Sequence, residues 1–346
     1  MTRGDKASLR LTIGLGLATG LAYGFAAKLP FVVCVMAVLV LCKPGPPMPL
    51  VKGIVVALIL AGLVAAGVVM VPLLEHYAVA GVLLTAAVLY AVFFAGQIRG
   101  GPVTTLLVIS FAMMPVAGVA EQSLIAVLSV TLAVGLGVGT LVSGLSNALF
   151  PDPPQQARAP APRAGAASAN WIALRGTIIV MPVFVLALTN PSFYLAAVMK
   201  TATLAQQAGE AQAGAASREL VGSTLMGSFL GMVVWMGLSL WPSLWMLVLW
   251  LMAAALWAGS AIFGVRRTRF GPSFWANALV TALILLGPAI EDSASGKSVL
   301  KGSVMRVCLF VGVALYASAT VWVLERWRSR ASRPVSRPDI HRASTK

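Results

Sequence analysis

Twelve apolar runs, separated by proline, glycine or charged residues, take up most of the chain and limit what it can fold into. A helix that crosses the hydrocarbon core of a bilayer needs about 20 predominantly apolar residues, and most of the runs reach that length. Hydrophobic residues make up 59% of the chain and charged residues only 10%, whereas soluble domains carry about 25% charged residues. The sequence therefore predicts an all-α integral membrane protein with twelve transmembrane helices. The runs are roughly 11–27, 30–42, 50–72, 78–96, 103–119, 122–149, 171–189, 191–205, 218–240, 242–262, 272–289 and 298–325.

Two of these runs, the second and the eighth, are too short to span a bilayer alone. A single helix over 11–42 would be ~48 Å long, too long for a hydrocarbon core of ~30 Å. Leu29-Pro30 also interrupts the run, and proline disfavours helix at the residue before it. Pro191 likewise disfavours helix at Asn190. We therefore expect a short helix to begin at each proline.

The basic residues predict the orientation of the spans. If the N-terminus is placed in the cytoplasm and the spans alternate, all but four of the 25 Lys and Arg residues fall on or near the cytoplasmic side. Cytoplasmic loops are enriched in Lys and Arg, so both termini are predicted to be cytoplasmic. The basic residues are dispersed over many loops and the tail, which argues against nucleic-acid binding and leaves the lipid bilayer as their partner. The four exceptions are Lys28, Lys297, Lys301 and Arg306.

One phrase recurs at about half the length of the chain. The stretches "GQIRGGPVTTLLV" (96–108) and "GVRRTRFGPSFWANALV" (264–280) each place arginine before a Gly-Pro pair, and the two pairs lie 170 residues apart. Leu9-Arg10 likewise matches Leu174-Arg175. Six crossings per half give both copies the same orientation, so we expect two parallel repeats related by an axis along the membrane normal. The predicted organisation is a first six-helix repeat (9–150), a Pro/Ala-rich cytoplasmic linker (151–170), a second repeat (171–327) and a basic disordered tail (328–346).

The repeated half, with an arginine opening its first span and a short proline-led second span, resembles the fusaric acid resistance and aromatic acid exporter superfamily. The stretches "LRGTIIV" (174–180), "RELVGSTLMGSFLGMVV" (218–234) and "FGPSFWANALVTALILL" (270–286) carry the resemblance best. Because only a short linker and tail stand where larger members have cytosolic domains, the chain is similar to the compact branch. The resemblance implies efflux of aromatic carboxylic acids or similar amphipathic anions across the bacterial inner membrane, together with a periplasmic adaptor of the membrane-fusion type.

An ionisable side chain at membrane depth is costly and so is a candidate for function. Lys200 lies nine residues after Pro191, and the equivalent position after Pro30 is Leu39, so the lysine is peculiar to the second half. The alternative is a lysine that reaches the headgroups with its ammonium. Arg306 is the second candidate, with interfacial anchoring as its alternative. Thr201, Thr203, Gln206 and Gln207 are expected near Lys200. Asn277 and Thr281 share one helix face and have interhelical hydrogen bonding as their alternative role.

These features favour a secondary exporter of organic anions. The chain has no nucleotide-binding signature, so coupling is expected to an ion gradient, most simply of protons. A passive organic-anion channel and a structural or assembly subunit without transport remain as alternatives, and a homo-oligomer is left open. Three cysteines and two histidines, with no plausible nucleophile and base, predict no metal, no cofactor and no enzyme activity.

Overall fold

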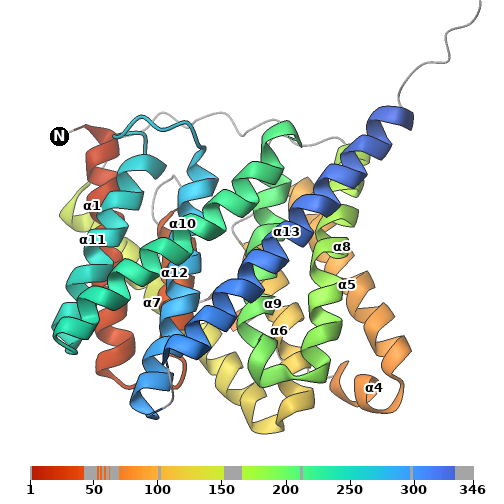
Figure 1. Cartoon of the computed structure of the whole chain (residues 1–346), viewed down its shortest axis with the longest axis horizontal. Coiled ribbons are helices and arrows are strands. Elements are labelled where there is room, and N and C mark those ends of the chain that lie inside the picture. Colours follow the sequence, from red (N-terminus) through yellow and green to blue (C-terminus); the bar gives the residue numbers. More distant parts are fainter. Residues whose placement is uncertain are drawn as a thin grey trace, which may run out of the picture.

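The computed structural model describes residues 2–42, 70–99, 103–151, 166–210, 213–296 and 299–331, together with a few single positions between 53 and 62. These residues form helices and no strand (Figure 1). Most of the expected third span (50–72), the first Gly-Pro pair, most of the expected linker and most of the expected tail lie outside the described residues, and residues 70–72 of that span form the start of α4. In the N-terminal half the helices are α1 (Arg3–Gly24), α2 (Pro30–Leu41), α4 (Met70–His76), α5 (Ala78–Arg99), α6 (Val103–Ala120) and α7 (Gln122–Leu149). In the C-terminal half they are α8 (Ala166–Thr189), α9 (Pro191–Glu210), α10 (Ala213–Leu240), α11 (Leu244–Ile262), α12 (Pro272–Ala294) and α13 (Val299–Ala331).

Seven of the described helices are long and apolar enough to cross a membrane. They are α5, α7, α8, α10, α11, α12 and α13, and two shorter apolar helices cover Pro30–Leu41 and Leu107–Ala120. The chain therefore has the architecture of a multi-pass membrane protein. Among the seven, α12 has the largest buried share of its span, at 78%, which makes it the central helix of the bundle.

Several helices extend beyond the apolar runs that predict them. α1 begins at Arg3, where Thr2 and Asp5 form a reciprocal capping box. α9 continues to Glu210 and is 20 residues long. α8 begins at Ala166 inside the expected linker, and α13 continues to Ala331 inside the expected tail. The cause is that Ala, Gln, Glu and Arg are good helix formers, so a helix can continue after its apolar run has ended.

Several helix–helix contacts join the N-terminal half of the chain to the C-terminal half. α1 packs along α11, and α5 packs along α8. α2 contacts α12, and α6 contacts α9. Within the N-terminal half α1 and α7 both pack on α2, and within the C-terminal half α8 and α13 both pack on α9. Each short proline-led helix is thus enclosed by helices of both halves.

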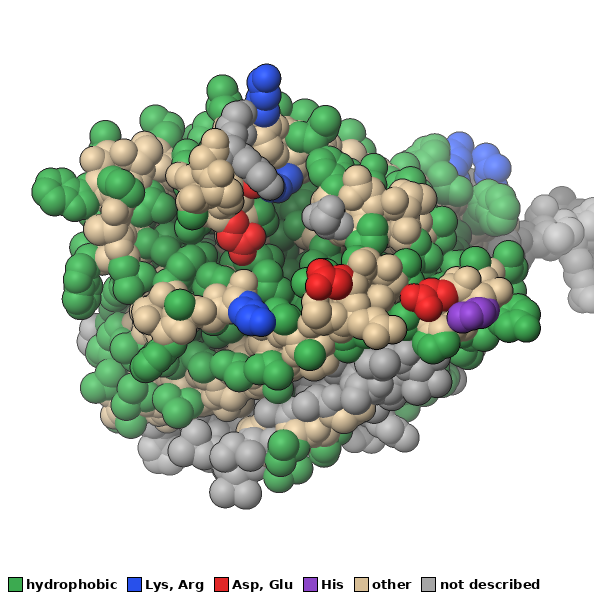
Figure 2. Space-filling model, turned by 90° about the horizontal axis from the view of Figure 1, so that it is seen from below, with side chains coloured by type: hydrophobic (Ala, Val, Ile, Leu, Met, Phe, Trp, Pro, Cys, Tyr) green, Lys and Arg blue, Asp and Glu red, His purple; other side chains and the backbone are tan. Residues whose placement is uncertain are grey.

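The two ends of the bundle differ in charge. The start of α1 and the end of α13 lie at the same end (Figure 1). Gly4 packs there against the segment after α11, where a Cβ on Gly4 would lie 2.8 Å from the carbonyl oxygen of Phe263. At the opposite end the surface shows carboxylates, Lys or Arg side chains and a histidine scattered among hydrophobic and uncharged side chains (Figure 2). The start of α1 carries Arg3 and Lys6, and the end of α13 carries Arg326, Arg328 and Arg330, so the end that holds both described termini is basic.

Candidate functional site

Lys200 lies in the interior of the bundle, halfway along α9. Its side chain is fully buried, and its ammonium donates to Thr281 Oγ1 at 2.6 Å and to Asn277 Oδ1 at 3.3 Å. Thr281 donates its own proton to the carbonyl oxygen of Asn277 at 2.6 Å, so its oxygen is free to accept. The ammonium thus ends between helices and does not reach a headgroup surface. Two of the predicted site residues, Asn277 and Thr281, are the residues that hold it, although the sequence did not pair them with Lys200.

The contact between α9 and α12 extends to α10 through a chain of buried polar groups. Asn277 Nδ2 donates to Ser223 Oγ at 2.8 Å. The Ser223 hydroxyl lies 3.2 Å from Gln207 Oε1 and 3.1 Å from the carbonyl oxygen of Leu220. Lys200, Asn277, Thr281, Ser223 and Gln207 therefore form one network, which we call the Lys200 network. All five residues are buried.

A glycine on α10 allows this network to form. A Cβ on Gly227 would lie 2.5 Å from both the carbonyl oxygen of Ala278 and the Cβ of Thr281. Only a residue without a side chain lets α10 approach α12 this closely, as small residues do generally between membrane helices. The close approach brings Ser223, one turn earlier on α10, within reach of Asn277.

The network contains more hydrogen-bond donors than acceptors. An ammonium carries three N–H groups, and the described residues supply only two acceptors to Lys200, neither of them a carboxylate. The Nε2 atoms of Gln206 and Gln207 are buried without a partner in the described part of the chain. Gln207 lies about 10 Å along α9 from Lys200. An arrangement of one cation and spare amide donors can bind a carboxylate.

The other predicted residues lie elsewhere or bond their own helix. The Thr201 hydroxyl donates to the carbonyl oxygen of Ala197 at 2.6 Å, and that of Thr203 to the carbonyl oxygen of Lys200 at 2.8 Å. Arg306 forms an ion pair with Asp292 at 2.8 Å, close to the start of α13. Neither threonine hydroxyl takes part in the network, and Arg306 lies outside it.

The sequence did not point to Ser223, whereas Gln207 is among the residues expected near Lys200. The signal for Ser223 is its spacing from Gly227 and Gly231, since positions i, i+4 and i+8 lie on one helix face. The signal for Gln207 is its position seven residues after Lys200, two helical turns along the same face. Neither spacing indicates a site unless it is also known which helix packs against that face.

An arginine clamp fixes the far end of α9. Arg175 on α8 is buried; its Nη1 pairs with Glu325 Oε1 at 2.9 Å, and its Nη2 contacts the carbonyl oxygen of Ala208. Arg10 on α1 bonds Asn147 Oδ1 on α7 at 2.7 Å. The arginines at matching sequence positions thus join matching helix pairs, α1 to α7 in one half and α8 to α13 in the other.

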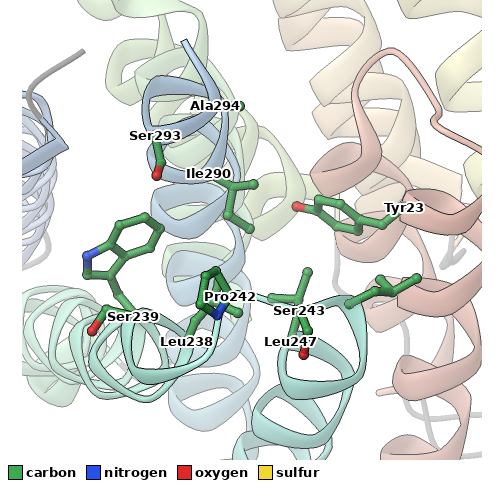
Figure 3. A pocket seen from close by; sticks show the side chains of 11 residues that line it. Tyr23, Leu238, Ser239, Pro242, Ser243, Leu247, Ile290, Ser293 and Ala294 are labelled. Carbon is green, nitrogen blue, oxygen red and sulfur yellow. The ribbon is translucent and has the colours of Figure 1, made fainter. Parts of the chain in front are cut away.

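A cavity of about 580 Å³ opens between α1, α10, α11 and α12. It lies at the end of the bundle away from the two described termini, where α10 connects to α11 (Figure 1). The close-up shows the Tyr23 hydroxyl directed from α1 towards Ile290 on α12 (Figure 3). No charged residue lines the cavity, whose described walls are apolar and hydroxyl-bearing.

Comparison with protein-family models, curated proteins and solved structures gave no match to this chain. Within the described ranges no group of His, Cys, Asp and Glu side chains is arranged to hold a metal ion. The Lys200 network and the cavity are therefore the two features of the described chain that bear on function.

Proposed function

We propose that the protein is a secondary transporter that exports aromatic carboxylic acids or similar amphipathic organic anions, with proton coupling. The observation that carries the proposal is the buried ammonium of Lys200, which has two neutral acceptors and no carboxylate partner in the described part of the chain. The spare N–H groups of Gln206 and Gln207 on the same helix add to it.

An unpaired buried charge costs several kcal/mol in proteins. Such a lysine is stabilised in two ways, by losing its proton or by gaining an anion. A carboxylate that binds next to Lys200 would favour the protonated form, and protonation would in turn favour carboxylate binding, because coupling between two ligands is reciprocal. Reciprocal favourable coupling of a proton and an anion at one site is what a carrier requires if it moves the two together in the same direction.

The proposed architecture is twelve transmembrane helices in two parallel six-helix repeats, with both termini in the cytoplasm. The paired helix packings support it, since exchanging the halves converts the α1–α11 contact into α8–α5 and the α2–α12 contact into α9–α6. The basic end of the bundle, which holds the start of α1 and the end of α13, supports the orientation. The resemblance to the fusaric acid resistance and aromatic acid exporter superfamily adds the bacterial inner membrane and a periplasmic adaptor as further elements of the proposal.

A passive channel is the second transport mechanism to separate from this one. A channel needs a continuous polar path, whereas the buried polar groups described here form a closed network between three helices. A carrier that alternates access around one binding site fits this arrangement better.

The test is uptake of radiolabelled benzoate into inside-out vesicles or proteoliposomes under an imposed pH gradient. Wild-type protein should accumulate benzoate above the level that protein-free liposomes reach under the same gradient, and Lys200→Met, which keeps most of the stem but removes the charge, should abolish this excess. Lys200→Arg should retain part of it, because the charge remains but the donor geometry changes. Lys301→Met, at an exposed lysine on α13, is the matched control and should behave as wild type.

Two results would overturn the proposal. Flux that equilibrates benzoate without accumulation, and does so equally in Lys200→Met, would indicate a channel. Flux no greater than in protein-free liposomes, across benzoate, salicylate and cinnamate, would indicate a subunit that does not transport.

A further inference from the structure

We propose that the cavity between α1, α10, α11 and α12 is a second, weaker binding site for the ring of the exported acid, on the side where the acid is released. This inference rests on the proposed function. The ligand assigned to the cavity is a one-ring aromatic carboxylic acid in either charge state. The Lys200 network by itself does not define this ligand class.

The walls of the cavity fit an aromatic ring. The lining combines the indole of Trp235 and the phenol of Tyr23 with aliphatic side chains such as Leu247 and Ile290. Aromatic side chains favour offset or edge-to-face contact with another ring. The volume of about 580 Å³ falls within the range of roughly 300–1,000 Å³ that is usual for small-molecule pockets.

The polar groups of the cavity fit a carboxyl group without demanding a charge. Within the described chain neither the Tyr23 hydroxyl nor the Ser293 hydroxyl takes part in a hydrogen bond. The Ser243 oxygen accepts from the backbone N–H of Met246, which leaves its proton to donate. The Tyr23 hydroxyl is directed into the space between α1 and α12 (Figure 3). These groups can donate to a carboxylate or to a neutral carboxylic acid or amide.

The absence of cations from the lining separates this site from Lys200. A carboxylate here would be held by neutral donors alone, and Glu291 and Asp292 follow Ile290 directly on α12. Neutral hydrogen bonds are about half as strong as charge-assisted ones. A weak site at the end of the bundle that is poor in basic residues is suited to release, whereas the Lys200 network selects the charged acid.

The test measures binding of radiolabelled benzoate to the full-length protein in lipid nanodiscs, in a Lys200→Met background that removes the inner site. Saturable binding should persist and should be displaced by benzamide, an uncharged molecule of nearly the same shape. Adding Ser239→Trp, which fills the cavity from α10, should abolish it. Leu240→Trp, at the next residue and 82% exposed, is the matched control and should leave it intact.

A second pair of variants tests the hydrogen bond. Tyr23→Phe should weaken benzoate binding about tenfold, since a hydrogen bond of ~1.4 kcal/mol corresponds to a factor of ten. Tyr77→Phe, at a tyrosine that is 69% exposed and outside the cavity, should have no effect. Equal binding in the Ser239→Trp and Leu240→Trp proteins, or no saturable binding in the Lys200→Met background, would overturn the inference. If the cavity fails this test but wild-type protein still shows gradient-driven export, the proposed function stands. If benzoate binds in the cavity but no export is measured, the proposed function alone is overturned.

Discussion

The two proline-led helices, α2 in the N-terminal half and α9 in the C-terminal half, occupy matching places in the bundle but have different interiors. α2 is 12 residues long and carries only apolar side chains and one cysteine. α9 is 20 residues long and buries Lys200, Thr201, Thr203 and Gln207. The position that matches Lys200 is Leu39, which is only half-buried. Buried hydroxyl groups occur in both halves, but the charged and amide side chains that are buried in the described chain, Arg175, Lys200, Gln207 and Asn277, all lie in the C-terminal half, although both helices begin in the same way.

Their shared neighbour α12 accounts for this difference. α12 contacts both α2 and α9, and it presents different residues to each. Gly287 faces Phe31 on α2, so closely that an added Cβ would collide with the ring. Asn277 and Thr281 accept the ammonium on α9. A buried lysine is tolerated only where the neighbouring helix offers acceptors, and α12 offers them on one side only.

The largest effect is expected when the polar character of α9 is transferred to α2. Met36 is fully buried on α2, so Met36→Lys would place an ammonium among apolar side chains. A lysine at the centre of a membrane helix costs ~3 kcal/mol on insertion scales, and we expect little folded protein in the membrane. The volume-conserving control Met36→Leu should cost less than about 1.5 kcal/mol.

The measurement for this pair is monodisperse protein after extraction, together with thermal unfolding in detergent. Wild-type yield and melting temperature for Met36→Lys would mean that α2 has acceptors within reach and that the contrast between the two helices is false.

An intermediate effect is expected from changes at Asn277. Asn277→Leu removes one acceptor of Lys200 and the donor to Ser223, and leaving a buried partner unsatisfied costs about 1–3 kcal/mol. Asn277→Asp instead gives Lys200 a carboxylate. We expect it to raise the melting temperature but to block benzoate export, since the ammonium is then paired within the protein. Export at wild-type rates by Asn277→Asp would contradict the view that substrate pairs with Lys200.

The smallest effect is expected from the threonines of α9, and it sharpens the assignment of the site. The Thr201 hydroxyl bonds only the carbonyl oxygen one turn earlier in its own helix, a type of bond that does not stabilise helices. Thr201→Val should therefore leave melting temperature and export unchanged. Thr281→Val removes an acceptor of Lys200 and should cost about 1–3 kcal/mol. Equal behaviour of the two valine variants would show that the Lys200 network does not distinguish these threonines.

The sequence by itself determined the class of the protein and the candidates. Apolar runs and charge composition predict a helical membrane protein, and proline positions place the starts of α2, α9 and α12 at Pro30, Pro191 and Pro272 as the structure has them. Lys200 stands out in the sequence because it is an ionisable residue within an apolar run. The position of the residue in that run indicates how deep in the membrane its charge would lie, and the cost of the charge depends on that depth. Helix ends were predicted less well, since polar helix formers continue α9 and α13 beyond their apolar runs.

Only the tertiary structure decided which polar residues meet. Asn277 and Thr281 lie 77 and 81 residues from Lys200 in the chain, and Ser223 joins them because Gly227 lets α10 approach α12. The same packing assigns Arg306 to Asp292 and the threonines of α9 to their own backbone. The periodicity of a sequence tells which face of a helix a residue occupies, but the partner of that face depends on how the helices cross, which is set by the close packing of many side chains at once.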